Sequence, residues 1–572
     1  MQERPTRHIA IVVLLLAAAL MLLGSVGTTH AASQRRQGQK TVFMPAVMQR
    51  PAEAATRDMT ILHLGVYQTV QTASNSVSLV QDKPTLLRVF AQSSGATTLP
   101  VAEVTVNAWR GATSLGSLTV GPQVVPAHPS SGDLYSTFNF DLPASWLAGD
   151  IVLTATIDAV NTVPEANESN NDFTSPFTFQ PVAPLQITIV PIRYTDTRTG
   201  RVFVATAHDP ISHWLLNAYP VSRVEISYHT PFAFTGDLRQ PAEWKRLLDS
   251  MTTLWAAEVG YGSARVYYGL IANSDDTGAS WFEGGVSGLG WVGERVSLGL
   301  DVGEDTGNSA GHEIGHNFGR QHAPCGNPSS VDPHYPYPNA TIGVYGVDTE
   351  DEVLLAPGAN YDMMSYCGPE WVSDYTYEAL FRDQQARTGR AADRATEGLL
   401  LRARLSDGGA EALPVYRLSG VAAPAGDGGY SVELVGADGA TLASYPASLL
   451  QAEETDVSAQ MIVAQVPAPR AAVAAVRFLR GGRILAERAL GVGLETAATA
   501  EVVASGDALT VQWGRPDVPA LVRVSADGQQ WTVLALDARG GQLTLARHEL
   551  PAGGQVQIIP GDGQPPLTVT LD

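Results

Sequence analysis

The stretch Gly311-His312-Glu313-Ile314-Gly315-His316-Asn317-Phe318-Gly319-Arg320-Gln321-His322 decides how the rest of the chain is interpreted. His312 and His316 are four residues apart, so on a helix they lie one turn apart on the same face and can reach one metal ion. Glu313 lies beside that face, where a carboxylate can act as general base toward a metal-bound water. Gly319 allows a sharp turn at positive φ, after which His322 can return as a third ligand. Three imidazoles with one position left for water predict a catalytic zinc site. The alternative is a polar helix whose histidines lie on the surface.

The same spacing resembles the extended motif of the metzincin clan of zinc metalloendopeptidases. Such enzymes also carry a methionine turn, and residues 361–367, Tyr-Asp-Met-Met-Ser-Tyr-Cys, supply a matching stretch. The resemblance implies that Met364 packs beneath the three imidazoles as an apolar floor. It also implies that Tyr366 approaches the zinc or hydrogen-bonds the tetrahedral intermediate, although an ordinary packed tyrosine is an alternative. The resemblance covers residues 185–390, and its motifs are specific only between Gly311 and Tyr366.

The fold class predicted on this basis is multidomain, with an α/β (α+β) metzincin-like catalytic domain between all-β immunoglobulin-like sandwich domains. The catalytic domain is expected over residues 181–395, where strands at 185–193, 223–228 and 264–272 alternate with an amphipathic helix at 241–258. A further helix is expected to begin at Ser373 or Asp374 and to run to residue 387. The resemblance implies that the strand before the zinc helix, at 295–300, lies at the sheet edge and binds extended peptide. The glycines of residues 284–293 would let substrate come close, or would form a flexible loop.

Short alternating apolar runs separated by turn residues predict β-sandwiches on both sides of this domain. The first, at residues 58–180, resembles adhesion-type modules of bacterial surface proteins. A small sandwich is expected at 396–495, and a module of fibronectin type III kind at 496–572. These modules would bind cell-surface or matrix glycans or proteins, or act as spacers. Structural Ca²⁺ at Asp158, Glu165 and Glu168 is an alternative to a solvated loop.

The N-terminus has the features of a targeting segment. Positive charge, an apolar core and a small-residue stretch predict a signal peptide at 1–32, followed by a linker or processing segment at 33–57. The protein is therefore expected to be secreted or cell-surface, and membrane-attached only if the segment stays uncleaved. The net charge of −21 excludes nucleic acid and anionic membrane as expected partners.

The chain has two cysteines, Cys325 and Cys367. One follows the third expected ligand by three residues and the other follows Met364 by three, so both should lie near the zinc. A disulfide between them suits an oxidising compartment and would tie the loop after the helix to the methionine turn. Two unpaired small core residues are the alternative.

The function predicted from these features is that of a secreted zinc-dependent metalloendopeptidase acting on internal peptide bonds of protein or peptide substrates. His312, His316 and His322 would hold the zinc, Glu313 would be the general base, and Tyr366 would stabilise the oxyanion. His334 is not expected to be a ligand, because three ligands and water complete the site. The alternatives are a surface adhesin or matrix-binding protein with a vestigial zinc domain, and a zinc hydrolase acting on a non-peptide bond.

Overall fold

The computed structural model describes residues 56–206, 210–387, 396–406, 408–420, 426, 429–454, 457–491, 500–505, 507–547 and 550–571. The predicted signal peptide and residues 33–55 of the predicted linker lie outside the described residues. No helix in the described part of the chain is long and apolar enough to cross a membrane.

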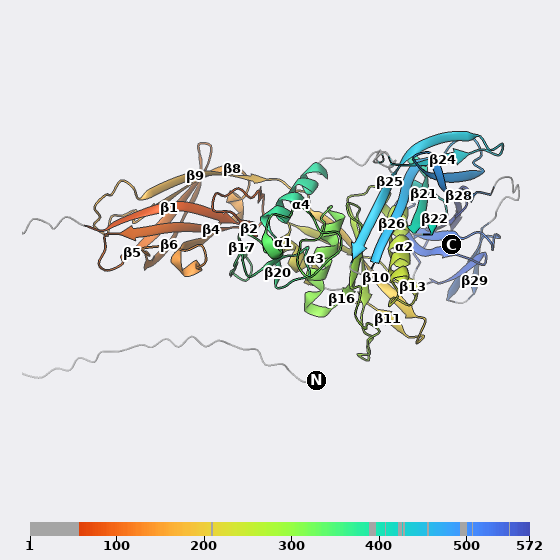
Figure 1. Cartoon of the computed structure of the whole chain (residues 1–572), viewed down its shortest axis with the longest axis horizontal. Coiled ribbons are helices and arrows are strands. Elements are labelled where there is room, and N and C mark those ends of the chain that lie inside the picture. Colours follow the sequence, from red (N-terminus) through yellow and green to blue (C-terminus); the bar gives the residue numbers. More distant parts are fainter. Residues whose placement is uncertain are drawn as a thin grey trace, which may run out of the picture. The chain divides into compact units, whose positions relative to one another are not determined.

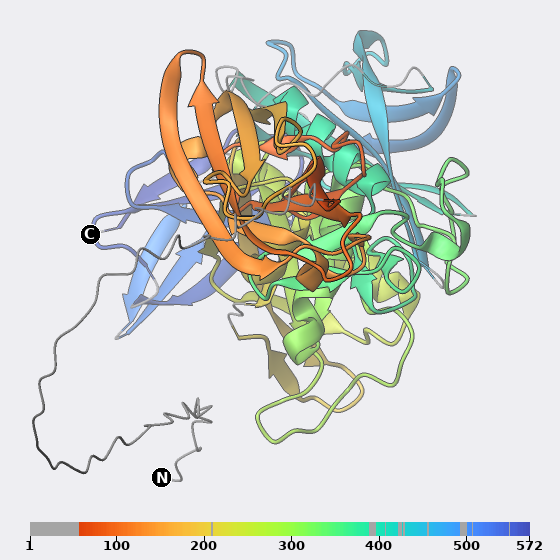
Figure 2. The ribbon, with the colours of Figure 1, turned by 90° about the vertical axis from the view of Figure 1, so that its left-hand side faces the viewer.

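The first part of the described chain is a β-sandwich, as predicted, with a three-stranded and a five-stranded sheet (Figures 1 and 2). Alternate residues of its strands are buried, and Val104, Val106 and Ala108 of one strand are fully buried in its core. In sheet order the strands are β1 (Asp58–Tyr67), β4 (Leu86–Ser94) and β7 (Phe138–Asp141), and β3 (Leu79–Val80), β9 (Asp172–Gln180), β8 (Gly149–Ile157), β5 (Val101–Arg110) and β6 (Thr113–Val124). Two short 3₁₀ helices, η1 (Leu134–Ser136) and η2 (Ala144–Trp146), lie between its later strands.

A seven-stranded mixed sheet follows, and it positions the candidate site. Its main path is β11 (Val202–Val204), β10 (Leu185–Asp196), β14 (Val266–Ala272), β16 (Val296–Asp301) and β15 (Gly288–Gly290), with β12 (Val224–Tyr228) and β13 (Phe232–Gly236) beside β10. The pairs β10–β14 and β14–β16 are parallel, whereas β15 is antiparallel to β16. The long apolar run of β10 is buried along most of its length, as expected for a strand covered on both faces.

The strand directly before the zinc-motif helix is not at the sheet edge, which corrects the expectation from the resemblance. That strand is β16, and it lies between β14 and β15. The edge is instead formed by β15, which comes from the glycine-rich segment. With only three residues, two of them glycine, β15 is too short to show a strand period in the sequence.

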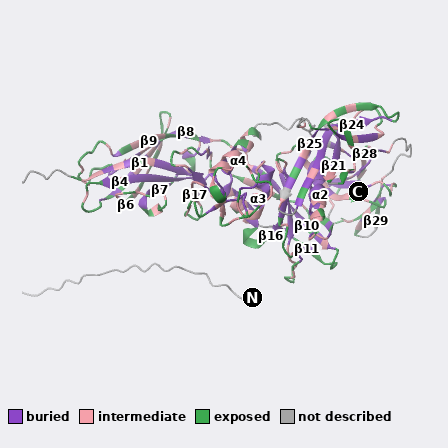
Figure 3. Cartoon of the chain, viewed as in Figure 1, coloured by how far each residue is buried: buried purple, intermediate pink, exposed green. Residues whose placement is uncertain are grey.

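Four α-helices are described: α1 (Pro210–Ala218), α2 (Pro241–Val259), α3 (Thr306–Asn317) and α4 (Asp374–Arg387). The predicted helix at 241–258 is confirmed as α2, which begins with proline at its first turn and buries Trp244, Leu247, Leu248, Met251, Leu254 and Trp255. The predicted helix to residue 387 is confirmed as α4. The zinc motif lies on α3, which packs on β16, on β15 and on α1, and Figure 3 shows its buried positions in purple.

The segment between α3 and α4 has short elements only. They are η4 (Pro338–Ala340), β17 (Tyr345–Asp348), β18 (Val353–Leu355), β19 (Tyr361–Asp362) and β20 (Glu370–Trp371), and a further short helix, η3 (Gly303–Asp305), precedes α3. Strand β17 pairs with β18 and with β2 (Val70–Gln71), a strand contributed by the residues that follow β1.

The last part of the described chain is again β-structure, in three sheets. The eight-stranded sheet contains β22 (Gly409–Ala412), β21 (Thr396–Ser406), β26 (Val457–Pro467), β25 (Thr441–Glu454), β24 (Tyr430–Val435), β27 (Ala475–Arg480) and β28 (Arg483–Ala489), with β23 (Tyr416–Gly420) beside β21. The others contain β29 (Glu501–Ser505), β30 (Ala508–Gln512) and β33 (Gln542–Ala546), and β32 (Thr532–Ala538), β31 (Ala520–Ser525), β34 (Gln555–Pro560) and β35 (Leu567–Thr570).

The predicted fold class is wrong. The structure is mostly β, with 47% strand and 14% helix, and its β-sandwich and barrel-like sheets indicate no α/β metzincin-like catalytic domain among the described residues. The prediction took the motif resemblance and the alternating strands and helices of residues 185–272 as signs of an α/β domain over residues 181–395. Between α3 and α4, proline, glycine and asparagine interrupt the apolar runs, so that part of the chain forms short ladders and turns.

Candidate metal centre

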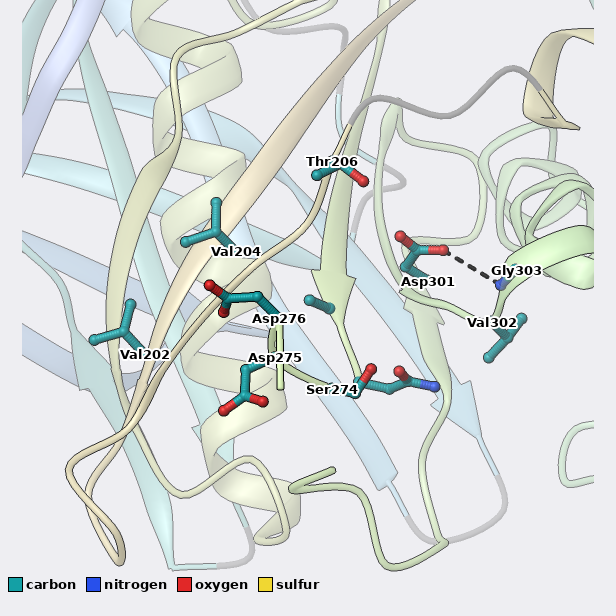
Figure 4. A pocket seen from close by; sticks show the side chains of 11 residues that line it. Val202, Val204, Thr206, Ser274, Asp275, Asp276, Asp301, Val302 and Gly303 are labelled. Carbon is teal, nitrogen blue, oxygen red and sulfur yellow. Dashed lines mark hydrogen bonds between the residues drawn. The ribbon is translucent and has the colours of Figure 1, made fainter. Parts of the chain in front are cut away.

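Helix α3 is held at both ends by groups close to the motif. At its start the Asp301 carboxylate accepts hydrogen bonds from the Thr306 hydroxyl at 3.1 Å and from the Gly303 backbone N–H at 3.3 Å, the second of which is drawn in Figure 4. At its end Gly319 has φ of 77°, as predicted, and the N–H of Arg320 donates to the carbonyl of Gly315. The helix therefore ends at Asn317, one residue after His316, and the chain turns back toward His322.

Glycines on α3 allow close packing against its neighbours. A Cβ at Gly311 would overlap the Trp214 ring of α1, and one at Gly315 would overlap the Met364 sulfur. Atoms do not tolerate such overlaps, so larger residues would push α3 away from α1 and from the methionine turn. The two glycines thus set the distance of the motif helix from α1 and from the methionine turn.

The three motif histidines are oriented in the same way. The Nδ1 atom of each ring lies 2.7 Å from a backbone carbonyl: His312 from that of Met363, His316 from that of Arg320, and His322 from that of Ser329. A carbonyl accepts only, so each Nδ1 carries the proton and donates, and each neutral ring presents an unprotonated Nε2. Such backbone bonds are the usual support of metal-binding histidines.

The Nε2 atoms converge, and a fourth donor joins them. The side chains of His312, His316, His322 and Glu454 each offer an atom within 4.8 Å of the others, and among the described residues this is the group that could hold a metal ion. His312 Nε2 and His316 Nε2 are 3.2 Å apart, and Glu454 Oε1 lies 3.7, 3.4 and 3.2 Å from the Nε2 atoms of His312, His316 and His322. A tetrahedron with ligand bonds of about 2.0–2.1 Å has edges of about 3.3 Å. The spacing therefore fits a small tetrahedral ion.

Glu454 was not predicted from the sequence. It ends β25 and lies 132 residues beyond His322, and its side chain is 11% exposed. Its position depends on how the eight-stranded sheet packs beside α3, which no local spacing encodes. The adjacent acidic pair Glu453-Glu454 is the signal in the sequence, and acidic residues are common on protein surfaces.

Glu313 lies inside the site beside the sheet edge. It is 5% exposed, and its Oε2 atom has no hydrogen-bond partner among the described residues. Its carboxyl group fills the space left by Gly288 of β15, where an added Cβ would lie 2.5 Å from Glu313 Cδ. A Cβ at Gly290 would lie 2.7 Å from the backbone carbonyl oxygen of Glu313. These two glycines make room for the predicted general base.

The charges of the cluster depend on burial and on Glu454. Burial raises the pKa of Glu313 well above its usual range, and the charge of Glu454 adds to the rise. Burial lowers the pKa of His316 to about 4, despite the opposing hydrogen bond with Glu454. Burial opposes charging of His312 as well, but Glu454 raises its pKa overall. For Glu454, burial is outweighed by the three histidines, which lower its pKa well below the usual range. A carboxylate with neutral imidazoles is the state that binds a metal ion.

The methionine turn lies directly under α3. Met364 is 1% exposed and its sulfur packs against Gly315, between the two helix histidines. The turn is held by Asp362, whose carboxylate accepts from the N–H of Met364 and from the N–H of Ser373. Met364 therefore packs against the motif helix, and its role as an apolar floor beneath the imidazoles stays a prediction.

Tyr366 lies at the open side of the cluster. Its hydroxyl is 3.2 Å from His322 Nε2 and donates a hydrogen bond to Glu454, and the residue is 36% exposed. Its ring contacts those of His312 and His322, with centroids 5.9 and 5.1 Å apart. The hydroxyl therefore lies where it can reach either a metal ligand or a bound substrate.

The predicted disulfide is confirmed. Cys325 and Cys367 are bonded, with Cα atoms 5.7 Å apart. Around the bond, Ala323 N–H donates to the Met364 carbonyl and Tyr366 N–H donates to the Cys325 carbonyl. The loop after α3 and the methionine turn are therefore joined both covalently and by backbone hydrogen bonds.

Other predicted or considered positions lie outside the cluster. The His334 side chain is 84% exposed and lies 3.5 Å from Asp332. The Asp158 carboxylate accepts from Thr162 and from the Val163 N–H, and thereby holds its own loop. Glu165 accepts from Met59 N–H and Asn171, and Glu168 from Glu165 N–H. These hydrogen bonds hold the segment between β8 and β9 and join it to β1.

Two pockets lie near the motif helix, and they differ in the residues that line them. One of about 310 Å³ opens over Glu313 and is also lined by Ser287, His312, Met363, Tyr366, Glu370 and Glu454. A larger one, of about 640 Å³, lies beyond Asp301 and is drawn in Figure 4. Its Asp275 carboxylate accepts from Thr277 and pairs with Arg201, so it stabilises a loop. Of the predicted site residues, His312, Glu313 and Tyr366 line the first pocket, and none lines the second.

Comparisons with known proteins add little. No family model matches the chain, and no curated protein matches it. Among solved structures, the CARDB domain of a Pyrococcus furiosus protein, in complex with di-metal ions, is 22% identical over 22% of this chain and 94% of its own, with a TM-score of 0.16. A Parabacteroides merdae β-glucuronidase is 10% identical over 90% of this chain and 77% of its own, with a TM-score of 0.14. Trypsin-activated α2-macroglobulin from Escherichia coli is 7% identical over 91% of this chain and 24% of its own, with a TM-score of 0.15. Similarities this weak carry no argument about fold or function.

Proposed function

We propose that this protein is a zinc-dependent metalloendopeptidase that resembles the metzincin clan in its motif. The observation that supports it most is the convergence of three Nε2 atoms beside Glu313, a buried carboxyl group with an unpartnered oxygen. A buried carboxyl group without a partner costs stability, and such costs are tolerated mainly at functional sites.

The donor set supports zinc as the metal. Three imidazoles and a carboxylate, with nitrogen and oxygen atoms spaced for a tetrahedron, match zinc sites and exclude the oxygen-only ligand sets that Ca²⁺ and Mg²⁺ prefer. His312, His316 and His322 would hold the ion. When bound, zinc would polarise the scissile carbonyl and lower the pKa of a water molecule.

The residues of the chain would supply the remaining chemistry. Glu313, with a raised pKa, would accept a proton from water and later hold the proton that the leaving amine needs. Tyr366 would donate a hydrogen bond to the oxyanion from the open side. Gly288 and Gly290 would present backbone groups of the sheet edge to an extended peptide.

The experiment is digestion of an unbiased peptide library, read by mass spectrometry, with and without a chelator and after zinc is restored. Internal cuts that disappear with chelator and return with zinc support the proposal. A protein that holds stoichiometric zinc and leaves every peptide intact, also when Glu454 is replaced by alanine, contradicts it.

A second function is favoured by one observation, the position of Glu454. A carboxylate as fourth protein ligand would close the site, as in structural zinc centres. The chain would then be a surface adhesin or matrix-binding protein in which the metal only stabilises the fold. Binding to cell-surface or matrix material that survives Glu313→Ala, with no cleavage by any variant, would support this alternative.

Secretion belongs to the same proposal. The Cys325–Cys367 disulfide supports an oxidising compartment. Protein or peptide substrates would then be extracellular, and the β-sandwiches would bring the site to surface or matrix material.

A further inference from the structure

Strand β25 approaches the site from the eight-stranded sheet. It is paired with β26 as far as Glu454, opposite Val457, so the carboxylate is carried by a hydrogen-bonded hairpin. Near its end Leu450 and Ala452 are buried in the same core as α3, and Val457 and Ala459 of β26 join them. The position of Glu454 is thus fixed by packing as well as by its contacts with the histidines.

The same strand also contacts the edge of the central sheet. The Leu300 N–H donates to the Ser287 carbonyl, and the Trp291 N–H donates to the Val296 carbonyl. In residues 287–291, the odd-numbered residues therefore point their backbone groups toward β16. In an antiparallel pair the residues between them point their backbone groups the other way, which applies to Gly288, Gly290 and Val292. The Val292 N–H points away from β16 and donates at 2.8 Å to the carbonyl of Gln451 in β25.

Residues 451–454 therefore make two kinds of contact that an extended peptide substrate would need. Gln451 accepts a main-chain hydrogen bond beside the sheet edge, and Glu454 places a carboxylate oxygen 3.2 to 3.7 Å from all three Nε2 atoms. Tyr366, which would face the oxyanion, donates its hydrogen bond to the same carboxylate. Water and substrate would have to replace these groups.

We propose that the β25–β26 hairpin is a built-in inhibitory segment, with Glu454 as a fourth metal ligand that blocks the reactive position while Gln451 occupies the peptide-binding edge. The inference rests on the proposed peptidase function. The folded chain is latent, and activity requires the carboxylate to leave the cluster. An internal ligand competes with any added ligand for the metal. The apparent affinity of the added ligand is its intrinsic affinity multiplied by the fraction of molecules in which the site is free.

The test compares the full-length zinc protein with Glu454→Ala and the isosteric Glu454→Gln. Glu433→Gln is the matched control, since it removes one negative charge from a half-buried position of the same sheet. The probe is acetohydroxamic acid, a small zinc ligand, and its binding is followed by titration calorimetry and by the visible spectrum of the cobalt-substituted protein. Cleavage of a library-derived peptide is measured in parallel.

The inference predicts that both Glu454 variants keep the metal, bind acetohydroxamic acid at least about tenfold more tightly and cleave at least about tenfold faster than wild type, while the control is unchanged. Equal hydroxamate binding and equal cleavage by all proteins would overturn it. Loss of the metal from both variants would also overturn it, because Glu454 would then be a permanent structural ligand. Tighter hydroxamate binding without cleavage by any protein would support the blocked metal position and contradict the proposed peptidase.

Discussion

Replacing Gly288 by alanine tests whether the space beside Glu313 matters for activity. An added Cβ would lie 2.5 Å from Glu313 Cδ and 2.8 Å from Cγ, whereas ordinary contacts begin at 3.4 Å. The added Cβ would also overlap Oε1, so the carboxyl group must move by at least about 0.9 Å, or β15 must shift by as much. A misplacement of about 1 Å at a catalytic group costs roughly 100-fold in rate, equal to about 2.7 kcal/mol of barrier.

The assay measures kcat/KM on a library-derived peptide, zinc content and the melting temperature. Gly358→Ala is the control, since a Cβ there meets nothing within 4 Å. Both changes are made in the wild-type chain and in Glu454→Ala. We expect Gly288→Ala to keep zinc, to lose about 1–3 kcal/mol of stability through overpacking and to lose about 100-fold in kcat/KM, with the control near its parent. A folded, zinc-loaded Gly288→Ala protein with unchanged kcat/KM would refute the reasoning.

Three further predictions concern single contacts. Tyr366→Phe removes the hydroxyl that would face the oxyanion, and kcat should fall about 10- to 100-fold with KM nearly unchanged; an unchanged kcat would give Tyr366 a packing role only. Replacing both Cys325 and Cys367 by serine opens a loop of 42 residues and should lower the free energy of unfolding in urea by about 4 kcal/mol, whereas a loss below about 1 kcal/mol would show that the bond adds little. Burial lowers the pKa of His229, but Glu258, whose carboxylate oxygen lies 2.9 Å from the ring, raises that pKa above 6.5 overall. The His229–Glu258 pair therefore stabilises the fold fully below pH 6.5, and this stabilisation is lost as the pH rises through the folded-state pKa of His229. The melting temperatures of wild type and His229→Gln should therefore differ most at acid pH, and a difference independent of pH would contradict the charge pairing.

The sequence predicted the local part of the site well. Two histidines four residues apart, the glycine at positive φ and the third histidine are encoded within twelve residues, and the structure brings the three rings together. The pairing of Cys325 with Cys367 was also predictable, because the chain has two cysteines and both follow groups expected at the metal. Helix α2 was found from the amphipathic pattern of its apolar residues.

The nonlocal part could not be predicted. Glu454 reaches the histidines through the packing of a strand from another sheet, and a pair of adjacent acidic residues gives no hint of that contact. The edge strand β15 is three residues long, so the sequence revealed the glycines of this segment but no strand pattern. The fold class was wrong because one run of alternating strands and helices was taken to represent the whole segment, although sheets dominate the chain.

The measurement that tests the central claim most directly is a comparison of Glu313→Gln with wild type, both in the Glu454→Ala background, for bound zinc and for peptide cleavage. Glutamine has the shape of glutamate but cannot accept the proton, so we predict equal zinc content and a loss of about 10²- to 10⁴-fold in kcat/KM. A Glu313→Gln protein that holds zinc and cleaves at the parent rate would contradict the claim that this buried carboxyl group is the general base of a peptidase.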